Sequence, residues 1–335
     1  TGVPKAILTG EAHLVADAER IIEEMGIRAD DIQLAAIPLS HSYGIGNLLM
    51  PLLLQGTSMV LRDAFVPKQL MLDARAFHAR VFPGVPYMFG YFAANPPPEG
   101  WPACLQLVIS AGAPLEAHVS QAFREQFGIK IHSFYGASEA GGIAYDAGDT
   151  ATPAGSVGTP MTGVTIVVRP DEDAPPGSGR VFLKSTSVAF GYAAADNEDD
   201  CPFQEGGYLT GDFGHLDASG RLILTGRVST AVNVAGRKVH PAEVERVLRS
   251  MDGIDDVCVL AAPDVRRGQQ ILACIVSRRQ PTVLEVRRFC AAHLAPHKIP
   301  RAIVFLPSLP TTSRGKTDRT HLIALALKQL EEDVT

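Results

Sequence analysis

The stretch LQLVISAGAPLEAHVSQAFREQFGIKIHSFYGASEAGG, residues 105–142, predicts the fold of the chain. It opens with a short apolar strand over 105–112. A helical pattern over 115–127 follows, which Gly128 ends, and a second apolar strand occupies 129–134. A polar or Gly-rich loop comes after each strand. A strand, a helix and another strand in this order are typical of a parallel sheet that helices cover.

The same rhythm extends toward the N-terminus. Residues 11–25 carry apolar residues at helical spacing, and 33–38 and 57–62 form short apolar strands. Because ligands of such sheets bind beyond the carboxyl ends of the strands, the loops after three of these strands predict one shared site. The loops are SHSYG, SAGAPL and YGASEAGG.

The pattern changes after residue 150, where strands such as VTIVV, RVFLK and LILTG alternate with turns. A smaller segment that mixes helices and strands follows Gly226-Arg227. We therefore expect an α/β fold with a helix-wrapped, mostly parallel sheet and a β-rich subdomain, followed by a small α+β C-terminal domain. The expected limits are 1–228 for the large domain, with its β-rich part at about 150–227, and 229–335 for the small domain.

The composition restricts the possible partners. The 335 residues are 46% apolar and carry a net charge of -6, which argues against nucleic acid or an anionic membrane as a partner. The five cysteines form no CxxC pair, so neither a disulfide framework nor a zinc knuckle is indicated, and a reducing cytoplasm is expected. The apolar run at 46–56 is too short to span a membrane.

The chemistry must come from six short polar motifs. A Thr/Gly segment with a lysine can surround phosphate, and a hydroxyl beside a carboxylate can hold phosphate and Mg²⁺. Each motif alone also fits a surface loop, a helix cap or a tight turn. The six motifs are TGVPKA (1–6), PLSHSYG (38–44), SFYGASE (133–139), YLTGD (208–212), GR (226–227) and LPTTSRGK (309–316).

In this order the motifs resemble those of the adenylate-forming superfamily of acyl-CoA synthetases, peptide-synthetase adenylation domains and beetle luciferases. The family patterns are TTGxPKG, P-x-x-H-x-x-G, YGxTE, YxTGD and PxTxxGK, together with a hinge segment that GRVSTAVNVAGRKVHPAEVE (226–245) resembles. The resemblance covers essentially the whole chain and is strongest to a stand-alone acyl- or aryl-CoA ligase. It implies that a carboxylate attacks the α-phosphate of ATP to give acyl-AMP, which a thiol then converts to a thioester.

The resemblance implies a role for each matching residue. Lys316 would stabilise the converging charges of the acid and the α-phosphate, and Glu139 would hold Mg²⁺. Ser138 would contact the phosphates, while Asp212 and Arg227 would contact the nucleotide. The other residues implied to bind ATP or coenzyme A are Thr1, Lys5, Gly112, Ala113, Pro114, Tyr135, Gly136 and Gly236. The small domain would rotate about a hinge at Ser229.

The acyl pocket is also implied by the resemblance, with His41 as the gate between the acid and the nucleotide. The remaining residues implied to contact the acid are Tyr43, Gly44, Val85, Gly136, Ala140, Gly141 and Gly142. The small side chains of Ala140, Gly141 and Gly142 leave room for a medium or aromatic acid. None of these residues is cationic, which favours an apolar acid.

Several alternatives stay open. A ligase that loads an acyl carrier protein uses the same pantetheine thiol as coenzyme A, and a catalytically inactive binding protein or fragment is a third reading. An amino-acid substrate is disfavoured because PLSHSYG lacks the Asp that would hold an ammonium group. The resemblance further implies an N-terminal portion before Thr1, so we expect these 335 residues alone not to turn over ATP.

Overall fold

The computed structural model describes residues 6–150, 152–193, 201–228, 232–234, 237–264, 268–279, 281–312 and 317–332. The chain groups into two compact units. The first contains residues 1–169, 180–210 and 214–224, and the second contains 170–179, 211–213 and 225–335. These units are defined by contacts within the chain and do not test the expected domain limits of 1–228 and 229–335, which remain a prediction.

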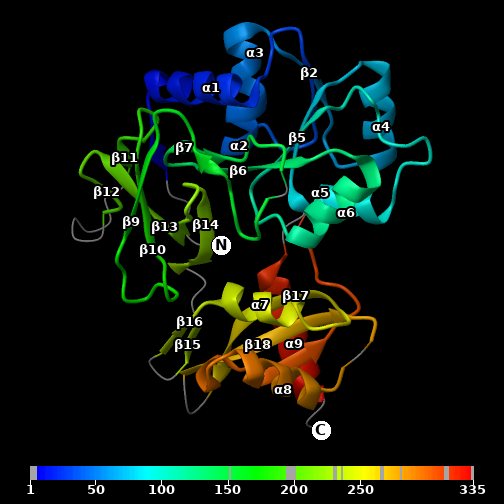
Figure 1. Ribbon diagram of the computed structural model, residues 1–335, viewed down its shortest axis with the longest axis vertical. Coiled ribbons are helices and arrows are strands. Elements are labelled where there is room, and N and C mark those ends of the chain that lie inside the picture. The colour runs from blue at the N-terminus through cyan, green and yellow to red at the C-terminus, as the bar shows by residue number, and fades with distance from the viewer. Residues whose placement is uncertain are drawn as a thin grey trace. The chain divides into compact units, whose positions relative to one another are not determined.

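A seven-stranded sheet forms the centre of the first unit, in the order β3-β2-β4-β5-β6-β7-β8 (Figure 1). The five strands from β3 to β6 are parallel, and β7 and β8 continue the sheet antiparallel. Every residue of β4 and β5 is buried, as expected where helices cover both faces. The strands are β2 (Ile32–Ala35), β3 (Ser58–Leu61), β4 (Val81–Gly84), β5 (Leu107–Ser110), β6 (Ile131–Ala137), β7 (Gly141–Tyr145) and β8 (Thr159–Pro160).

Helices connect these strands. Gly26 and Gly128 adopt left-handed φ angles of 60° and 69°, and they end α1 and α6 where the sequence predicts. An aromatic cluster packs α5 against α6, with the rings of Trp101 and Phe123 4.9 Å apart. The helices are α1 (Glu11–Met25), α2 (Ser42–Gly44), the π-helix η1 (Ile45–Leu49), α3 (Met50–Gln55), α4 (Pro67–Ala76), α5 (Pro86–Ala94) and α6 (Ala117–Phe127).

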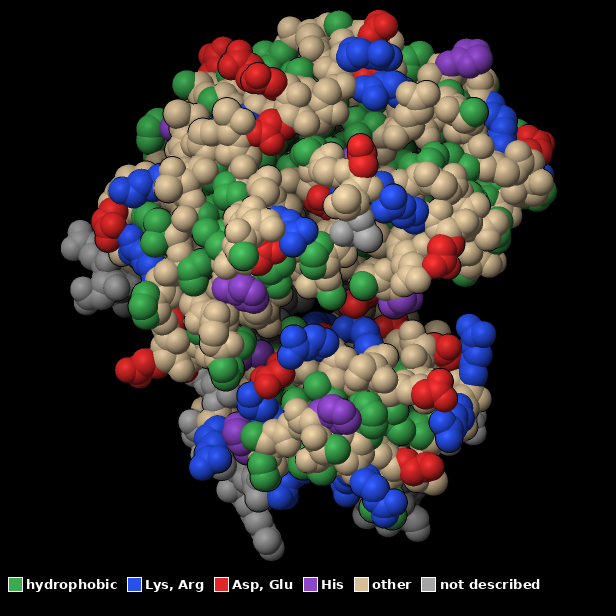
Figure 2. All heavy atoms as spheres, viewed as in Figure 1, with side chains coloured by type: hydrophobic (Ala, Val, Ile, Leu, Met, Phe, Trp, Pro, Cys, Tyr) green, Lys and Arg blue, Asp and Glu red, His purple; other side chains and the backbone are tan. Residues whose placement is uncertain are grey.

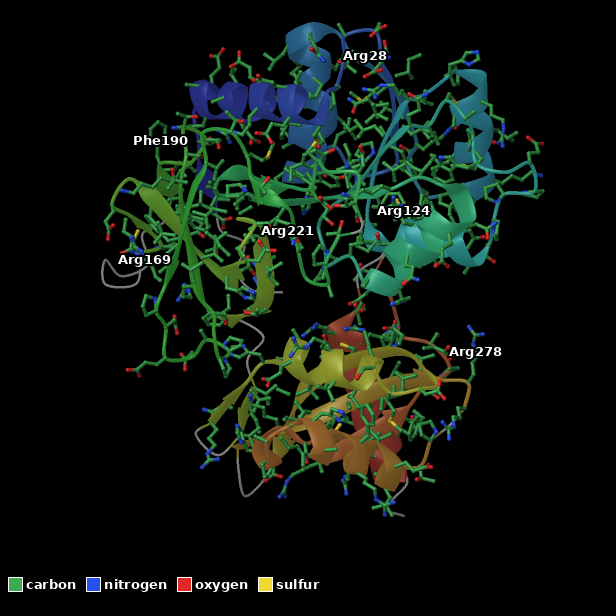
Figure 3. All side chains as sticks on the ribbon, in the orientation of Figure 1. Arg28, Arg124, Arg169, Phe190, Arg221 and Arg278 are labelled. Atoms are coloured by element: carbon green, nitrogen blue, oxygen red, sulfur yellow. The ribbon has the colours of Figure 1, made fainter. Side chains whose placement is uncertain are left out.

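The β-rich segment forms a second sheet of five strands, in the order β12-β13-β10-β9 with β14 paired to β13. Arg169, labelled in Figure 3, ends β9 of this sheet. Its guanidinium lies 3.7 Å from the centre of the Phe182 ring in β10. A short antiparallel pair, β1 (Ile7–Leu8) with β11 (Gly191–Tyr192), lies apart from this sheet. The strands of the five-stranded sheet are β9 (Thr165–Arg169), β10 (Gly179–Lys184), β12 (Phe203–Gln204), β13 (Gly207–Leu216) and β14 (Leu222–Arg227).

The C-terminal segment of the second unit is a sheet with helices on both faces. Its order is β16-β15-β18-β17, with β19 parallel to β18. Alternate residues of β17 and β18 face two separate apolar cores, one beneath α7 and α8 and the other beneath α9. The elements are β15 (Val232–Val234), β16 (Arg237–Val239), α7 (Pro241–Arg249), β17 (Ile254–Asp264), β18 (Gly268–Ser277), α8 (Val283–His293), the 3₁₀ turn η4 (Pro296–Lys298), β19 (Ala302–Phe305) and α9 (Arg319–Glu332).

The predicted fold class is confirmed by these two units. The first has the helix-wrapped, mostly parallel sheet, and the second has the α+β arrangement expected after residue 228. Basic and acidic side chains are interspersed on the face that Figure 2 shows. Among the described residues, no helix combines the length and the apolar character that crossing a membrane requires.

Candidate active site

Two of the predicted loops meet at one edge of the central sheet. The PLSHSYG motif follows β2 and the YGASE motif ends β6, and both strands belong to the parallel part of the sheet. Ser42 and Ser138, 96 positions apart, share a hydrogen bond of 2.9 Å between their hydroxyl oxygens. Both side chains are exposed, so this junction of two motifs lies at the surface.

The PLSHSYG loop is held in a defined shape. His41 precedes α2, and its Nδ1 accepts a hydrogen bond from the backbone N–H of Tyr43 at 3.2 Å. The hydroxyl of Tyr43 donates to the carbonyl of Ile109 in β5 at 3.2 Å. Burial raises the pKa of Tyr43 well above its usual value, so the phenol remains a donor. Tyr43 is therefore a core residue here, and its direct contact with an acid stays a prediction.

Glu139 is oriented by a residue that the motifs did not reveal. The hydroxyl of Tyr192 in β11 donates to Oε1 of Glu139 at 2.9 Å, and the N–H of Ala189 donates to the Glu139 carbonyl at 2.9 Å. Burial, with the Glu139 carboxylate as a second cause, raises the pKa of Tyr192 to about 12. The phenol thus stays protonated near neutral pH. The adjacent Gly191-Tyr192 pair is too common to have marked this partner in the sequence.

The run Ala140-Gly141-Gly142 is small because the protein itself fills the space beside it. Ala140 is fully buried. A Cβ atom on Gly141 would lie 2.3 Å from the carboxylate of Asp17, and one on Gly142 would lie 2.9 Å from the Sδ atom of Met161. This corrects the expectation that the run leaves an open space for the acid, since α1 and the core occupy it. Contact of these three residues with an acid stays a prediction.

The other predicted residues of this unit lie at the same edge or beside it. Gly112, Ala113 and Pro114 are exposed just after β5, next to β6, which carries Tyr135 and Gly136. Val85 lies between β4 and α5, as the residue that caps the start of the helix. A Cβ atom on Gly44 would lie 2.2 Å from the carbonyl oxygen of Pro38, so this glycine is needed for the loop's own close packing.

Two predicted nucleotide residues meet in the second unit. Arg227 Nε lies 3.2 Å from Asp212 Oδ1, with the carboxylate mostly buried and the guanidinium exposed. Their strands, β13 and β14, are paired in the sheet. The ion pair keeps both side chains together at one point. The predicted residues Thr1, Lys5, Ser229, Gly236 and Lys316 lie outside the described residues.

The oxygen donors at Glu139 suit a nucleotide-borne Mg²⁺. The described residues include no group of three or more His, Cys, Asp or Glu side chains that could enclose a metal ion. Mg²⁺ commonly uses one or two carboxylates and completes its coordination with substrate phosphates and water. The Glu139 carboxylate and the Ser138 hydroxyl are hard oxygen ligands of the kind this ion prefers, so the residues fit the group.

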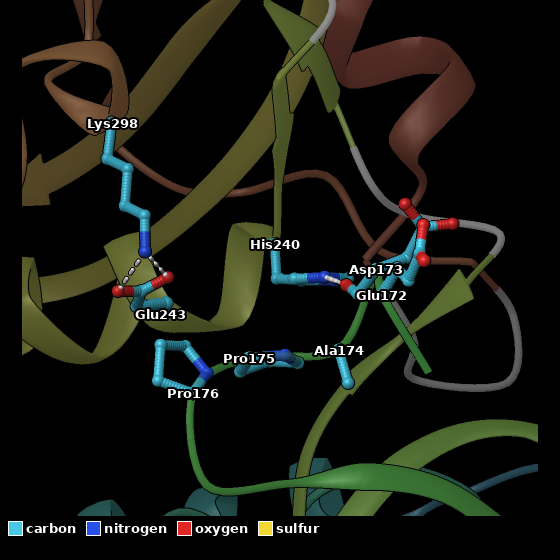
Figure 4. Close-up of a pocket in the computed structure, with 8 residues that line it drawn as sticks. All are labelled: Glu172, Asp173, Ala174, Pro175, Pro176, His240, Glu243 and Lys298. Atoms are coloured by element: carbon cyan, nitrogen blue, oxygen red, sulfur yellow. Dashed lines mark hydrogen bonds and ion pairs between the residues drawn. The ribbon is translucent and has the colours of Figure 1, made fainter. Parts of the chain in front are cut away.

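The second unit also contains a hollow of about 290 Å³, whose lining does not include Asp212 or Arg227 (Figure 4). It lies between the turn that joins β9 to β10 and the start of α7. There Lys298 Nζ contacts both oxygens of Glu243 at 2.7 Å, and His240 donates from Nε2 to the Asp173 carbonyl. Of the predicted site residues that the structure describes, none lines it. The lining residues are Glu172, Asp173, Ala174, Pro175, Pro176, His240, Glu243 and Lys298.

Comparison with known proteins assigns the family. The model of the AMP-binding enzyme family matches residues 1–193, more than half of the chain, and the model of the AMP-binding enzyme C-terminal domain matches 243–316. The chain belongs to the AMP-binding enzyme family. This match confirms the resemblance to adenylate-forming enzymes that the six motifs suggested.

Relatives in this family carry CoA-ligase names. The 2-succinylbenzoate–CoA ligase of Enterococcus faecalis is 31% identical over 94% of this chain and 66% of its own length. ATP-bound MatB from Rhodopseudomonas palustris superposes with a TM-score of 0.83 at 25% identity, covering 97% of this chain and 66% of that one. The o-succinylbenzoate CoA synthetase of Bacillus subtilis, solved with its acyl-adenylate, gives 0.79 at 25% identity over 96% and 66%. The chain thus spans about 66% of the length of these relatives.

Proposed function

We propose that the chain provides most of the active site of an ATP-dependent carboxylic acid:CoA ligase. The observation that carries this proposal is the meeting of two family motifs at one sheet edge, where Ser42 and Ser138 are hydrogen-bonded beside Glu139. The family membership and the CoA-ligase relatives support it. A site built from loops at the carboxyl ends of parallel strands is where α/β sheets commonly bind nucleotides.

The first half-reaction joins the acid to AMP. A carboxylate oxygen attacks the α-phosphorus of ATP, and the bond to the β-phosphate oxygen breaks, which releases pyrophosphate. The acid is already ionised, so charge stabilisation matters more than a general base. Lys316 would neutralise the converging oxygens, and Glu139 and Ser138 would hold Mg²⁺ and phosphate. When bound, Mg²⁺ offsets the phosphate charge.

The resemblance assigns Asp212 to the ribose of the nucleotide. Its carboxylate can accept hydrogen bonds from the ribose hydroxyls while Arg227, 3.2 Å away, orients it. In the second half-reaction a thiol sulfur attacks the acyl carbon, AMP departs with the bonding electrons, and the thiol proton goes to solvent. Coenzyme A is the proposed thiol, and an acyl carrier protein is the alternative. All five cysteines are free thiols, in keeping with a cytoplasmic location.

The proposed acid is apolar. The residues that the resemblance assigns to the acyl pocket include no cation that could pair with a second carboxylate. Because Gly141 packs closely against Asp17, the small run 140–142 no longer supports a roomy pocket. The apolar character of the assigned residues is the remaining support for an apolar acid. Relatives named for both aromatic and dicarboxylic acids make this a question for experiment.

The test is a panel of acids assayed with the intact protein for ATP-dependent pyrophosphate release. It should contain aromatic, medium-chain, long-chain and dicarboxylic acids. We expect release with an apolar acid, and thioester formation when coenzyme A is added. If pyrophosphate is released but a thioester forms only with a phosphopantetheinylated carrier protein, the alternative acceptor is favoured.

An inactive binding protein is the second reading. Its signature would be ATP binding by calorimetry without pyrophosphate release for any acid in the panel. A protein that neither binds ATP nor releases pyrophosphate would contradict the proposed function altogether.

A further inference from the structure

Helix α1 reaches the loop that follows Glu139. The backbone N–H of Gly142 donates to Asp17 Oδ1 at 2.7 Å, across 125 positions in the sequence. Asp17 is mostly buried, so this charge-assisted bond forms away from bulk water, where it is strongest. One face of α1 is therefore tied directly to the backbone just beyond the predicted Mg²⁺ ligand.

Gly141 has the conformation that this contact requires. Its φ angle is +69°, in the left-handed region, and an added Cβ atom would lie 2.3 Å from the Asp17 carboxylate. A side chain at 141 would displace either Asp17 or the loop. The glycine thus serves the approach of α1, a role that the motif by itself did not indicate.

A second side chain of α1, Arg20, is linked through Ser187 to Ala140, the residue before Gly141. Arg20 donates to Ser187 Oγ at 3.0 Å, and Ser187 Oγ donates to the carbonyl of Ala140 at 2.7 Å. Arg20 also lies within 3.4 Å of the Gly142 carbonyl oxygen. Both Arg20 and Ser187 are buried. The backbone on each side of Gly141 is thus bonded to groups that α1 controls.

We propose that Asp17 and Arg20 are positioning residues that hold the Glu139–Gly142 loop so that Glu139 and Ser138 face the nucleotide phosphates. The inference rests on the proposed function for the identity of the ligand, and on the contacts above for the mechanism. Asp17 and Arg20 form an ion pair at 3.8 Å, one turn apart on α1, so the two side chains act together. Neither residue belongs to a motif of the site.

The first test measures the loop itself, without any ligand. Hydrogen exchange of the peptide that contains Gly142 is followed in the wild type, Asp17→Ala, Asp17→Asn and the control Glu19→Ala, whose side chain lies on the exposed face of α1. We expect about tenfold faster exchange at Gly142 in Asp17→Ala, because one protecting hydrogen bond is lost. Asp17→Asn keeps an acceptor oxygen and should stay close to the wild type, as should Glu19→Ala.

The second test measures pyrophosphate release by the intact protein as a function of Mg²⁺ concentration. Partners that orient a metal ligand typically change metal affinity or activity by about 10- to 100-fold when they are removed. Asp17→Ala should therefore raise the half-saturating Mg²⁺ concentration at least tenfold. Asp17→Asn should restore most of the Mg²⁺ response.

Two further variants keep the test decisive if Asp17→Ala does not fold. Ser187→Ala removes only the hydroxyl that bonds to Ala140, and Gly141→Ala pushes against Asp17 from the loop side. Both should raise the Mg²⁺ requirement in the same direction. Unchanged Gly142 exchange and an unchanged Mg²⁺ response in folded variants would overturn the proposal. If the wild type shows no ligase activity but Asp17→Ala still speeds exchange at Gly142, the proposed function is wrong. The hold of Asp17 on the loop would then stand without it.

Discussion

The Tyr192 hydroxyl donates a 2.9 Å hydrogen bond to Oε1 of Glu139, joining the short strand β11 to the end of the YGASE motif. A carboxylate that accepts a hydrogen bond from a fixed donor loses rotational freedom. Because the pKa of Tyr192 is raised to about 12, first by burial and then by this carboxylate, the phenol donates throughout the neutral range. Tyr192 therefore supports Glu139 from a part of the chain without any recognised motif.

Tyr192→Phe should raise the half-saturating Mg²⁺ concentration for pyrophosphate release about tenfold, because the metal ligand loses the partner that orients it. The ring contact of Tyr192 with Phe203, at 5.2 Å between centroids, survives this change. Tyr91→Phe, at an exposed position of α5, is the control and should leave the response unchanged. An unaltered Mg²⁺ curve in Tyr192→Phe would show that the hydrogen bond has no part in metal binding.

Asp212→Ala should weaken the binding of ATP and leave the affinity for the acid nearly unchanged. A hydrogen bond to a charged group contributes about 1.5–3 kcal/mol, so calorimetry should register a loss of roughly 10- to 100-fold. Asp217→Ala is a matched control, because Asp217 pairs with Arg221 at 2.8 Å at the turn between β13 and β14. Equal ATP affinity in the wild type and Asp212→Ala would reduce Asp212 to a partner of Arg227.

Lys316→Ala should abolish acyl-AMP formation and largely spare thioester formation from supplied acyl-AMP. Only the first half-reaction brings a carboxylate and an α-phosphate oxygen together, and loss of one stabilising contact costs about a thousandfold in rate. The two half-reactions are measured separately by pyrophosphate release and by thioester yield. Lys68→Ala, an exposed lysine of α4, is the control. Near-normal adenylation in Lys316→Ala would remove this residue from the mechanism.

Asp17 should make folding stability depend on pH. Burial raises the pKa of Asp17 from 3.8 to about 6, against the smaller opposing effects of the Gly142 N–H and Arg20. The folded protein then takes up this proton at a higher pH than the unfolded chain. The group's contribution to stability is full below pH 4 and is lost as the pH rises through 6.

The measurement is urea unfolding of the wild type and Asp17→Asn between pH 4 and pH 7. The free energy of unfolding of the wild type, relative to the variant, should fall by about 2 kcal/mol over this range. The variant cancels the contributions of other titrating groups. Parallel curves for the two proteins would mean that Asp17 titrates in its ordinary range.

Gln33→Met should stabilise the protein. Gln33 is fully buried in β2, and neither polar atom of its amide has a hydrogen-bond partner in the described part of the chain. Burying an unpaired amide costs about 1–3 kcal/mol, which an apolar side chain of similar length avoids. Gln55→Met is the matched control and should destabilise, because its amide donates to Ile27 and Thr57. A less stable Gln33→Met would indicate a buried water that satisfies this amide.

The order of strands, helices and motifs was readable from the sequence because those signals are local. Apolar runs mark buried strands, and a glycine such as Gly26 ends a helix by its own conformational freedom. Elements with weak local signals were missed. The strand β4 contains Pro83 and Gly84, which usually indicate a turn, and only its position between β2 and β5 makes it a strand.

The sequence by itself thus determined the family and the α/β class, and it predicted the residues that bear the chemistry. What supports those residues was decided by the tertiary structure alone. Asp17 meets Gly142 across 125 positions and Tyr192 meets Glu139 across 53, and no periodic pattern joins such distant residues. Even Gly141, which looks like spare room in the sequence, is a glycine because the carboxylate of a helix far earlier in the chain packs against it. Contacts of this kind depend on how the sheet brings its loops together, so local propensity carries no trace of them.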